Sequence, residues 1–297
     1  MTTATVTEQQ QLQQARQRRR PGKGRKRAWD EAPRWQIYLP LGLYLLFTLI
    51  PFYWILLFAL RPSGSTSLVP WPVTFEHFDK VWTERSFATF FQNSLLVGVA
   101  SMVMTTLVAL AGGYALARFD FRIKRGFMLA LLCSQFIPGA LMLVPLFQIF
   151  AELQMINSLA SVIIAETVFQ LPLSMILISG FIKNVPYSLE EAAWVDGCGR
   201  FRAFCAIVLP MLRPGLIAVG SFAFVHSWNH FLFALMFLSD QGKQTIPVGL
   251  ATLMGADSVD LGALAAGGVV AAVPVVIVFA FIQKWLVTGF SAGAVKG

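Results

Sequence analysis

Long apolar runs recur along the chain between residues 37 and 287. Each run is close to the roughly 20 residues that an α-helix needs to cross the hydrocarbon core of a bilayer. We therefore predict an all-α, polytopic membrane protein with about six transmembrane helices. The predicted spans are residues 37–60, 93–117, 127–150, 158–181, 207–238 and 261–287. The fifth run is long, and Pro210 and Pro214 near its start predict that its first turns are interfacial or bent.

The segments that flank these runs divide the chain into three parts. Residues 1–34 are rich in Gln and then in Arg and Lys, a composition that cannot bury a core, so we predict a disordered basic segment. No small-residue cleavage site follows it, and the first span is expected to be retained rather than removed with a signal peptide. Residues 35–288 form the predicted transmembrane domain, and residues 289–297 form a predicted tail.

Basic residues are distributed unevenly between the two sides of this arrangement. If the N-terminus is inside, the inside segments carry 19 of the 23 Lys and Arg residues. The outside segments carry only Arg61, Lys80, Arg85 and Lys243. Because cytoplasmic loops of membrane proteins carry the excess of Lys and Arg, both termini are predicted to be cytoplasmic. The expected location is the plasma (inner) membrane.

The composition agrees with a membrane protein and argues against two other classes. The chain is 56% hydrophobic and 13% charged, whereas soluble domains are about 25% charged. The net charge of +8 could indicate nucleic-acid binding, but nine of the 23 basic residues precede the first span, where they are typical of a topology signal. Cys133, Cys198 and Cys205 show no metal-binding spacing, so neither a metal site nor a nucleic-acid partner is predicted.

The largest inside connection, about residues 184–206, has the features of two short helices joined by a turn. Glu190 and Glu191 would lie in the first turn of a helix, where carboxylates interact favourably with the helix dipole. Gly197 allows backbone angles that other residues resist, and a second helix is expected to begin near Arg200. Two small alanines, Ala192 and Ala193, on an exposed helix would let another protein approach closely, although an ordinary amphipathic connector between spans is the alternative. The residues singled out are Glu190, Glu191, Ala192, Ala193, Asp196, Gly197, Arg200, Phe201 and Pro210.

The spacing within this connection resembles the EAA loop of ABC importer permeases. Glu191-Ala192-Ala193 is followed after three residues by Gly197, with Asp196 immediately before the glycine. Nine residues separate Gly197 from Ile-Val-Leu-Pro at residues 207–210, as in that loop. The resemblance implies a type I ABC importer permease fold. It also implies that the loop docks in a cleft of an ATPase subunit and couples ATP hydrolysis to transport.

Other segments resemble the MalG-type permeases of carbohydrate importers, and this resemblance covers about residues 35–297. The second span ends in Tyr-Ala-Leu-Ala-Arg-Phe at residues 114–119, and the fifth contains Trp-Asn-His-Phe at residues 228–231. His230 stands where that family usually has an acidic residue. The resemblance implies a sugar as the solute, either a mono- or an oligosaccharide. It further implies that a cytoplasmic tail reaches the ATPase dimer, through Ala294, Val295, Lys296 and Gly297.

Several partners are implied by the same resemblance. They are a second permease subunit, a dimer of ATPase subunits, an external solute-binding protein and membrane lipid. ATP and Mg²⁺ would bind to the ATPase and no cofactor to this chain, which lacks the G-x-x-x-x-G-K-[ST] phosphate-binding loop. The chain also has no H-E-x-x-H motif, so we expect a transport subunit rather than an enzyme. A self-contained secondary transporter or channel for a small polar solute is the alternative, but ionisable residues are sparse within the spans.

Polar residues in the fourth and fifth spans are candidates for the translocation path. Glu166 and Gln170 are one helical turn apart and therefore share a face. A carboxylate within a membrane span usually faces a bundle interior or a water-filled cavity. In the fifth span, two histidines and an asparagine can face one side with an aromatic ring near its edge. Hydrogen bonds between helices are the alternative role for the whole set, which is Glu166, Gln170, His226, Trp228, Asn229 and His230.

Overall fold

The computed structural model describes residues 34–83, 86–255 and 259–294. All of the predicted basic segment except Arg34 lies outside the described residues, as do Val295, Lys296 and Gly297 of the tail. Within the described ranges every regular element is a helix, which confirms the predicted all-α class. The chain divides into two compact units, residues 1–54 and residues 55–297.

The first unit is described over residues 34–54, which form most of helix α2 (Arg34–Leu60). Trp35–Leu60 is long enough to cross a membrane and has a mean hydropathy of 2.2. Large apolar side chains such as Tyr44, Leu46 and Phe47 are exposed around it. A helix that is hydrophobic on all sides is typical of a membrane span.

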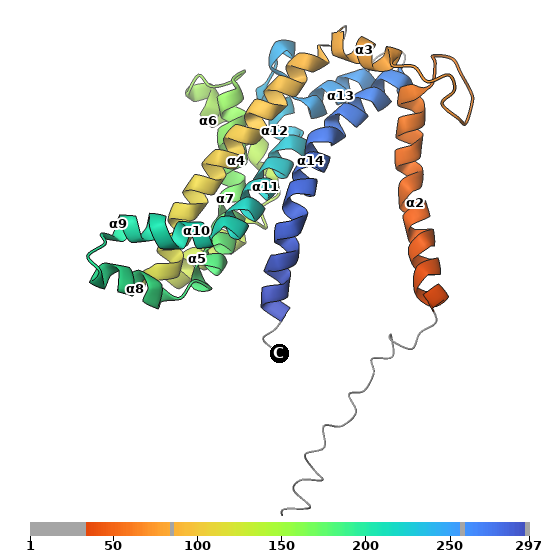
Figure 1. The fold of residues 1–297 in the computed structure, drawn as a ribbon. Helices are drawn as coiled ribbons and strands as arrows, with labels where there is room; N and C mark the ends of the chain where they lie inside the picture. Colours follow the sequence, from red (N-terminus) through yellow and green to blue (C-terminus); the bar gives the residue numbers. More distant parts are fainter. Residues whose placement is uncertain (1–33, 84–85, 256–258, 295–297) are drawn as a thin grey trace, which may run out of the picture. The chain divides into compact units, whose positions relative to one another are not determined.

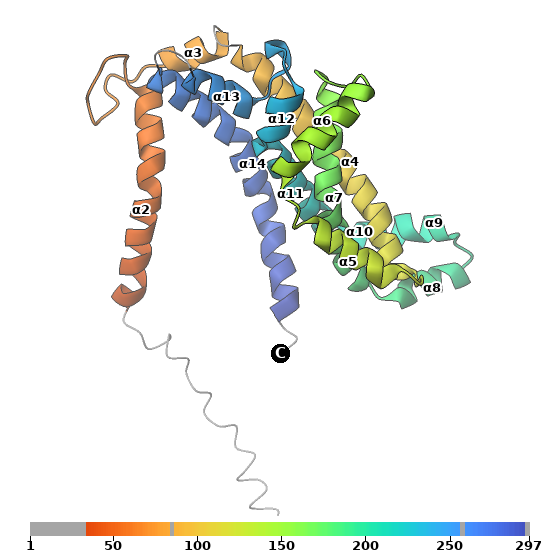
Figure 2. The ribbon, with the colours of Figure 1, turned by 180° about the vertical axis from the view of Figure 1, so that it is seen from behind.

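The second unit contains the remaining helices, which Figures 1 and 2 show from opposite sides. Their bounds are α3 (Glu76–Thr83), α4 (Phe87–Arg118), α5 (Lys124–Ser134), α6 (Leu143–Glu152), α7 (Leu159–Lys183), α8 (Tyr187–Val195), α9 (Arg200–Ala203), α10 (Leu209–Met211), α11 (Arg213–Asn229), α12 (Leu232–Phe237), α13 (Ile246–Met254) and α14 (Leu261–Ala294). Two short 3₁₀ turns, Gly139–Met142 and Gln241–Lys243, and a π-helical turn, Phe204–Val208, complete the unit.

The core of this unit is the packing of α4 against α7, with α11 beside both helices (Figures 1 and 2). The buried residues of α4 include a row at four-residue spacing: Ser101, Thr105, Ala109 and Gly113. Small residues at a helix interface allow two backbones to approach closely, which favours helix association inside a membrane. The small side chains of α4 therefore place α7 and α11 close to it.

Two adjacent glycines of α4 test this packing. A methyl group at Gly113 would lie 2.7 Å from Ile178 Cγ2 and 3.1 Å from the Met175 carbonyl oxygen, whereas at Gly112 it would meet the flexible end of the Met175 side chain. We expect Gly113→Ala to destabilise the subunit by about 1–3 kcal/mol, because the backbone of α7 cannot move aside. Gly112→Ala is the matched control and should have a smaller effect. Thermal unfolding of the purified subunit in detergent measures both; equal melting temperatures for the two variants would contradict the packing.

Among the residues that the structure describes, four helices are long and apolar enough to cross a membrane, and the number of spans rises to six if each of two bent helix pairs counts as one. The third predicted span is not the continuous helix expected over residues 127–150. It consists of Lys124–Ser134 and Gly139–Glu152, which meet at 96°. Pro138 is extended at the break (φ −60°, ψ 127°), and a proline disfavours the helical conformation in the residue before it.

The fifth predicted span is also divided. Its first turns are bent, as predicted, because Arg200–Met211 and Arg213–Asn229 meet at 74°. The chain breaks again at His230, whose backbone is extended (φ −77°, ψ 124°), and α12 follows. The predicted helix over residues 207–238 is therefore α10, α11 and α12 in succession.

Candidate functional site

The predicted helical loop is present at the end of the second unit where α4 ends, as α8 and α9 (Figure 1). Helix α8 begins after Pro186 and ends at Val195. Gly197 has a φ of 83°, a left-handed conformation that glycine adopts without strain and that commonly ends a helix. Helix α9 begins at Arg200, as predicted. Pro210 lies in the first turn of α10, beyond the π-helical turn.

The outer face of this loop exposes apolar surface. Val195 is 88% exposed and Phe201 is 80% exposed, and the two residues stand on either side of the turn at Gly197. The exposed residues around them are Glu191, Ala192, Asp196 and Arg200. Exposed apolar groups rimmed by polar ones mark interaction surfaces. The arrangement therefore provides a surface on which a protein can dock.

The opposite face of α8 is buried against the end of α4. Glu190 is 1% exposed, and Ala193, one helical turn later, is buried as well. Arg118 Nε lies 2.7 Å from Glu190 Oε1, and the Tyr114 hydroxyl donates a hydrogen bond of 2.7 Å to Glu190 Oε2. The expectation that both alanines of the loop are exposed is wrong for Ala193, because residues three apart share a helical face and Glu190 turns that face inward.

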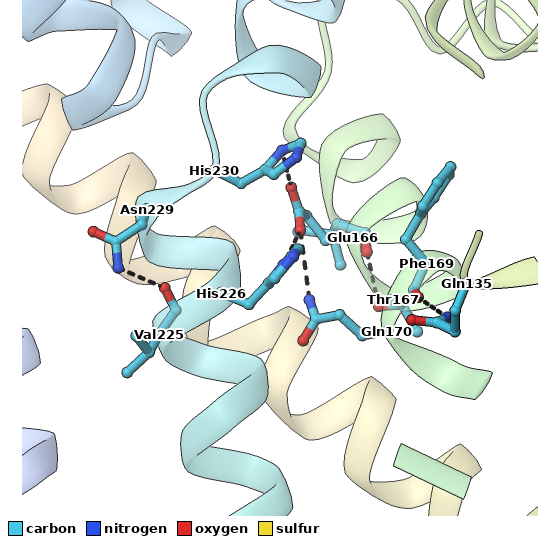
Figure 3. Close-up of polar contacts among 10 residues, drawn as sticks. Gln135, Glu166, Thr167, Phe169, Gln170, Val225, His226, Asn229 and His230 are labelled. Atoms are coloured by element: carbon cyan, nitrogen blue, oxygen red, sulfur yellow. Dashed lines mark hydrogen bonds and ion pairs between the residues drawn. The ribbon is translucent and has the colours of Figure 1, made fainter. Parts of the chain in front are cut away.

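A second group of polar side chains lies between α7 and α11. Glu166 on α7 has no exposed surface. Its Oε1 lies 2.7 Å from His230 Nδ1, and its Oε2 lies 3.2 Å from His226 Nδ1. Gln170 donates a hydrogen bond of 3.4 Å to the same Oε2. Figure 3 shows the carboxylate between these three side chains.

The chemistry of this cluster depends on its burial. A buried carboxylate is tolerated only when it is paired or hydrogen-bonded. The imidazole rings of His226 and His230 are stacked, with centroids 5.4 Å apart, and their side chains are 39% and 22% exposed. The cluster therefore joins a buried acid to two partly accessible imidazoles at the break between α11 and α12.

Two candidates from the fifth span lie elsewhere. Trp228 is buried among aromatic rings, and its indole N–H donates a hydrogen bond of 3.0 Å to the Ala271 carbonyl on α14. Asn229 donates to the Val225 carbonyl at 2.8 Å, and Figure 3 shows it pointing away from Glu166. The expectation that Asn229 faces the same side as the histidines is therefore wrong. At the end of α11 its amide turns back to a carbonyl of its own helix.

The partners of Glu190 could not be found by sequence reasoning. Tyr114 and Arg118 are 76 and 72 positions away, and no periodicity indicates a contact between them and the loop. Their four-residue spacing on the last turns of α4 was the only available signal, since it places them on one face. In the part of the chain that the structure describes, no three His, Cys, Asp or Glu side chains are grouped to hold a metal ion.

Comparisons with known proteins agree with this architecture. Residues 108–292 match the family described as "binding-protein-dependent transport system inner membrane component". The chain is 35% identical over 252 residues to the diacetylchitobiose uptake system permease protein DasC of Streptomyces coelicolor, an alignment that covers 83% of this chain and 91% of the relative. It is 32% identical over 252 residues to the melibiose/raffinose/stachyose import permease protein MelC of Bacillus subtilis, and this alignment covers 84% of this chain and 91% of the relative.

A solved structure shares the fold. A chain in the crystal structure of a bacterial ABC transporter involved in the import of the acidic polysaccharide alginate superposes with a TM-score of 0.72 at 20% identity, over 85% of this chain and 98% of that chain. This confirms the predicted ABC importer permease fold. From the family match and the relatives together, the chain belongs to the inner-membrane permease subunits of binding-protein-dependent ABC transporters.

Proposed function

We propose that this subunit forms half of the translocation pathway for a mono- or oligosaccharide that an external binding protein delivers, and that partner ATPase subunits drive the transport. The observation that carries the proposal is the α8–α9 loop, whose exposed Val195 and Phe201 provide a docking surface. The sugar class is supported by the relatives, which are named for diacetylchitobiose and for melibiose, raffinose and stachyose. A second alginate transporter structure of the same fold includes an alginate-bound periplasmic protein.

The orientation follows from the charge distribution. With both termini in the cytoplasm of a bacterium, the basic residues collect on the inside and the α8–α9 loop faces the cytoplasm, where ATP is available. The loop fits into a partner ATPase, which holds ATP and Mg²⁺. Closure of the ATPase dimer moves the loop, and the membrane helices follow as rigid bodies. A second permease subunit supplies the other half of the pathway.

The membrane part of the proposal rests on the Glu166 cluster. Glu166, Gln170, His226 and His230 provide hydrogen-bonding groups beside the broken end of α11, as a polar solute requires. Trp228 supports this segment from the buried side. Asn229 lies on the exposed surface of α11, where it can contact a partner subunit or the solute.

Purification of the full-length subunit from its native membrane in mild detergent tests this function. We expect a P-loop ATPase, a second six-span permease and an external binding protein to co-purify, and the solute retained by the binding protein to be a sugar. Uptake into liposomes by the reconstituted complex should require ATP. If the subunit alone moved solute under an ion gradient, the proposal would be wrong and the chain would act as a secondary transporter.

The tail provides a separate prediction for the same complex. Deleting residues 294–297 should lower ATP hydrolysis that depends on solute and binding protein, because the tail is proposed to reach into the ATPase dimer. We expect a decrease of about two- to tenfold, which corresponds to the net contribution of about one hydrogen bond. The rate measured on the assembled complex in proteoliposomes decides this. An unchanged rate after the deletion would remove the tail from the coupling machinery.

A further inference from the structure

The inner end of α4 holds both arms of the α8–α9 loop. Arg118 makes the ion pair with Glu190, and its Nη2 donates a hydrogen bond of 2.9 Å to the Val185 carbonyl just before α8. Tyr114 binds Glu190 through its hydroxyl, and its ring packs against Phe204, just after α9, with centroids 4.9 Å apart. Two side chains of one helix therefore contact the loop at its entry, in its first helix and at its exit.

The chemistry of this contact fixes both the position and the orientation of Glu190. Each oxygen of the Glu190 carboxylate has its own partner at 2.7 Å, and the side chains of Arg118 and Glu190 are 8% and 1% exposed. A buried ion pair that loses one member leaves an uncompensated charge, so the two residues remain associated whenever the loop is folded. An arginine presents its donors in a fixed planar fork, which sets an orientation as well as a distance.

The neighbouring residue has a different environment. Glu191 lies on the exposed face of α8, beside Ala192 and on the side of Val195. Only one of the two adjacent glutamates can therefore reach a docked protein without leaving its present contacts. In this motif Glu191, which a partner protein can reach, lies next to Glu190, which binds α4 of the same chain.

A packed route leads from this contact into the membrane. At Gly113, directly before Tyr114, α4 lies close against α7, because a methyl group added there would lie 2.7 Å from Ile178 Cγ2 and 3.1 Å from the Met175 carbonyl oxygen. Helix α7 also carries Glu166, about two and a half turns before Met175 on the same continuous helix. Packed side chains and rigid helices with discrete arrangements are the elements that carry coupling between distant sites.

We infer that Glu190 is a positioning residue that fixes α8 to α4 through Arg118 and Tyr114, so that a movement of the loop is passed to α4 and then to α7. Glu190 does not contact the ATPase. This inference rests on the proposed function, in which the loop receives the movement from the ATPase. It assigns the two glutamates different roles: Glu191 faces the partner, and Glu190 transmits the movement of the loop to α4.

The test uses the whole transporter in proteoliposomes and the variant Glu190→Gln, which keeps the shape of the side chain and removes its charge. We expect normal assembly with the ATPase and continued ATP hydrolysis, with sugar uptake per ATP lowered at least about fivefold. Arg118→Gln should give the same decrease, and the double variant should be no worse than either single one, since both remove one interaction. Glu152→Gln, at an exposed glutamate that ends α6, is the matched control.

Three results would overturn the inference. They are an unchanged uptake per ATP in Glu190→Gln, additive losses in the double variant, and dissociation of the ATPase from a subunit that is otherwise folded. If Glu190→Gln did not assemble at all, Tyr114→Phe would test the inference instead, because it removes one hydrogen bond and keeps the ring against Phe204. An unchanged sugar uptake per ATP in Tyr114→Phe would also reject the inference. Failure of the proposed function appears separately, as a wild-type complex whose uptake does not require ATP.

Discussion

Replacing Val195 and Phe201 together by serine should abolish sugar uptake while the subunit still folds and enters the membrane. Both side chains are more than three-quarters exposed, so their loss leaves no cavity. In the complex they would be the buried anchors of the interface with the ATPase, and such anchors are worth about 1–2 kcal/mol or more each. Since about 1.4 kcal/mol changes affinity tenfold, we expect association to weaken about 100-fold. The amount of ATPase that co-purifies and the initial rate of uptake measure the effect.

The control for this variant is Ile123→Ser. Ile123 is another apolar side chain, 71% exposed, and it lies in the connection from α4 to α5 at the same end of the unit. It loses a similar apolar area but is not part of the α8–α9 loop. Equal losses of bound ATPase in both variants would mean that any exchange of an exposed apolar side chain for serine at this end of the unit weakens the association, whether or not it lies in the loop. Normal uptake in the Val195/Phe201 variant would exclude this surface as the docking site.

The sequence predicts the loop well because its signals are local. A glycine that must adopt a left-handed conformation and a second helix starting near Arg200 are both properties of neighbouring residues, and both are confirmed. The direction in which α8 faces could not be predicted, since it depends on Arg118, 72 positions away. Ala193 is therefore buried, although the sequence predicts an exposed helix there.

The same difference between local and distant signals applies to the membrane helices. Hydropathy predicts about six spans, because the thickness of the bilayer fixes their length, and the described residues contain four such helices, or six spans if each bent pair counts as one. It does not predict that the third span bends by 96° at Pro138, or that the fifth breaks at His230. Four-residue spacing correctly groups Glu166 with Gln170 and His226 with His230. Only the packing of α7 beside α11 brings the two groups together into one cluster.

Replacing Glu166 by leucine should destabilise the subunit and stop uptake. The carboxylate contacts both imidazoles and Gln170, and its loss leaves these polar groups facing an apolar side chain in the membrane interior. Removing one member of a buried charged network lowers stability by about 3–5 kcal/mol. We expect the melting temperature of the purified subunit to fall clearly and uptake by the reconstituted complex to be lost. Glu166→Gln keeps an oxygen and an N–H in place and should lower both quantities less.

Thr167→Val is the matched control for Glu166→Leu. Thr167 is the next residue of α7 and is also buried, but its hydroxyl bonds to the Ile163 carbonyl of the same helix (Figure 3). Valine has the same shape, and the loss of one hydrogen bond within a helix lowers stability by only about 1 kcal/mol. The two variants therefore separate a polar group that joins α7 to α11 from one that serves α7 alone. If Glu166→Leu were as stable and as active as Thr167→Val, the cluster would neither join these helices nor contribute to the path of the solute.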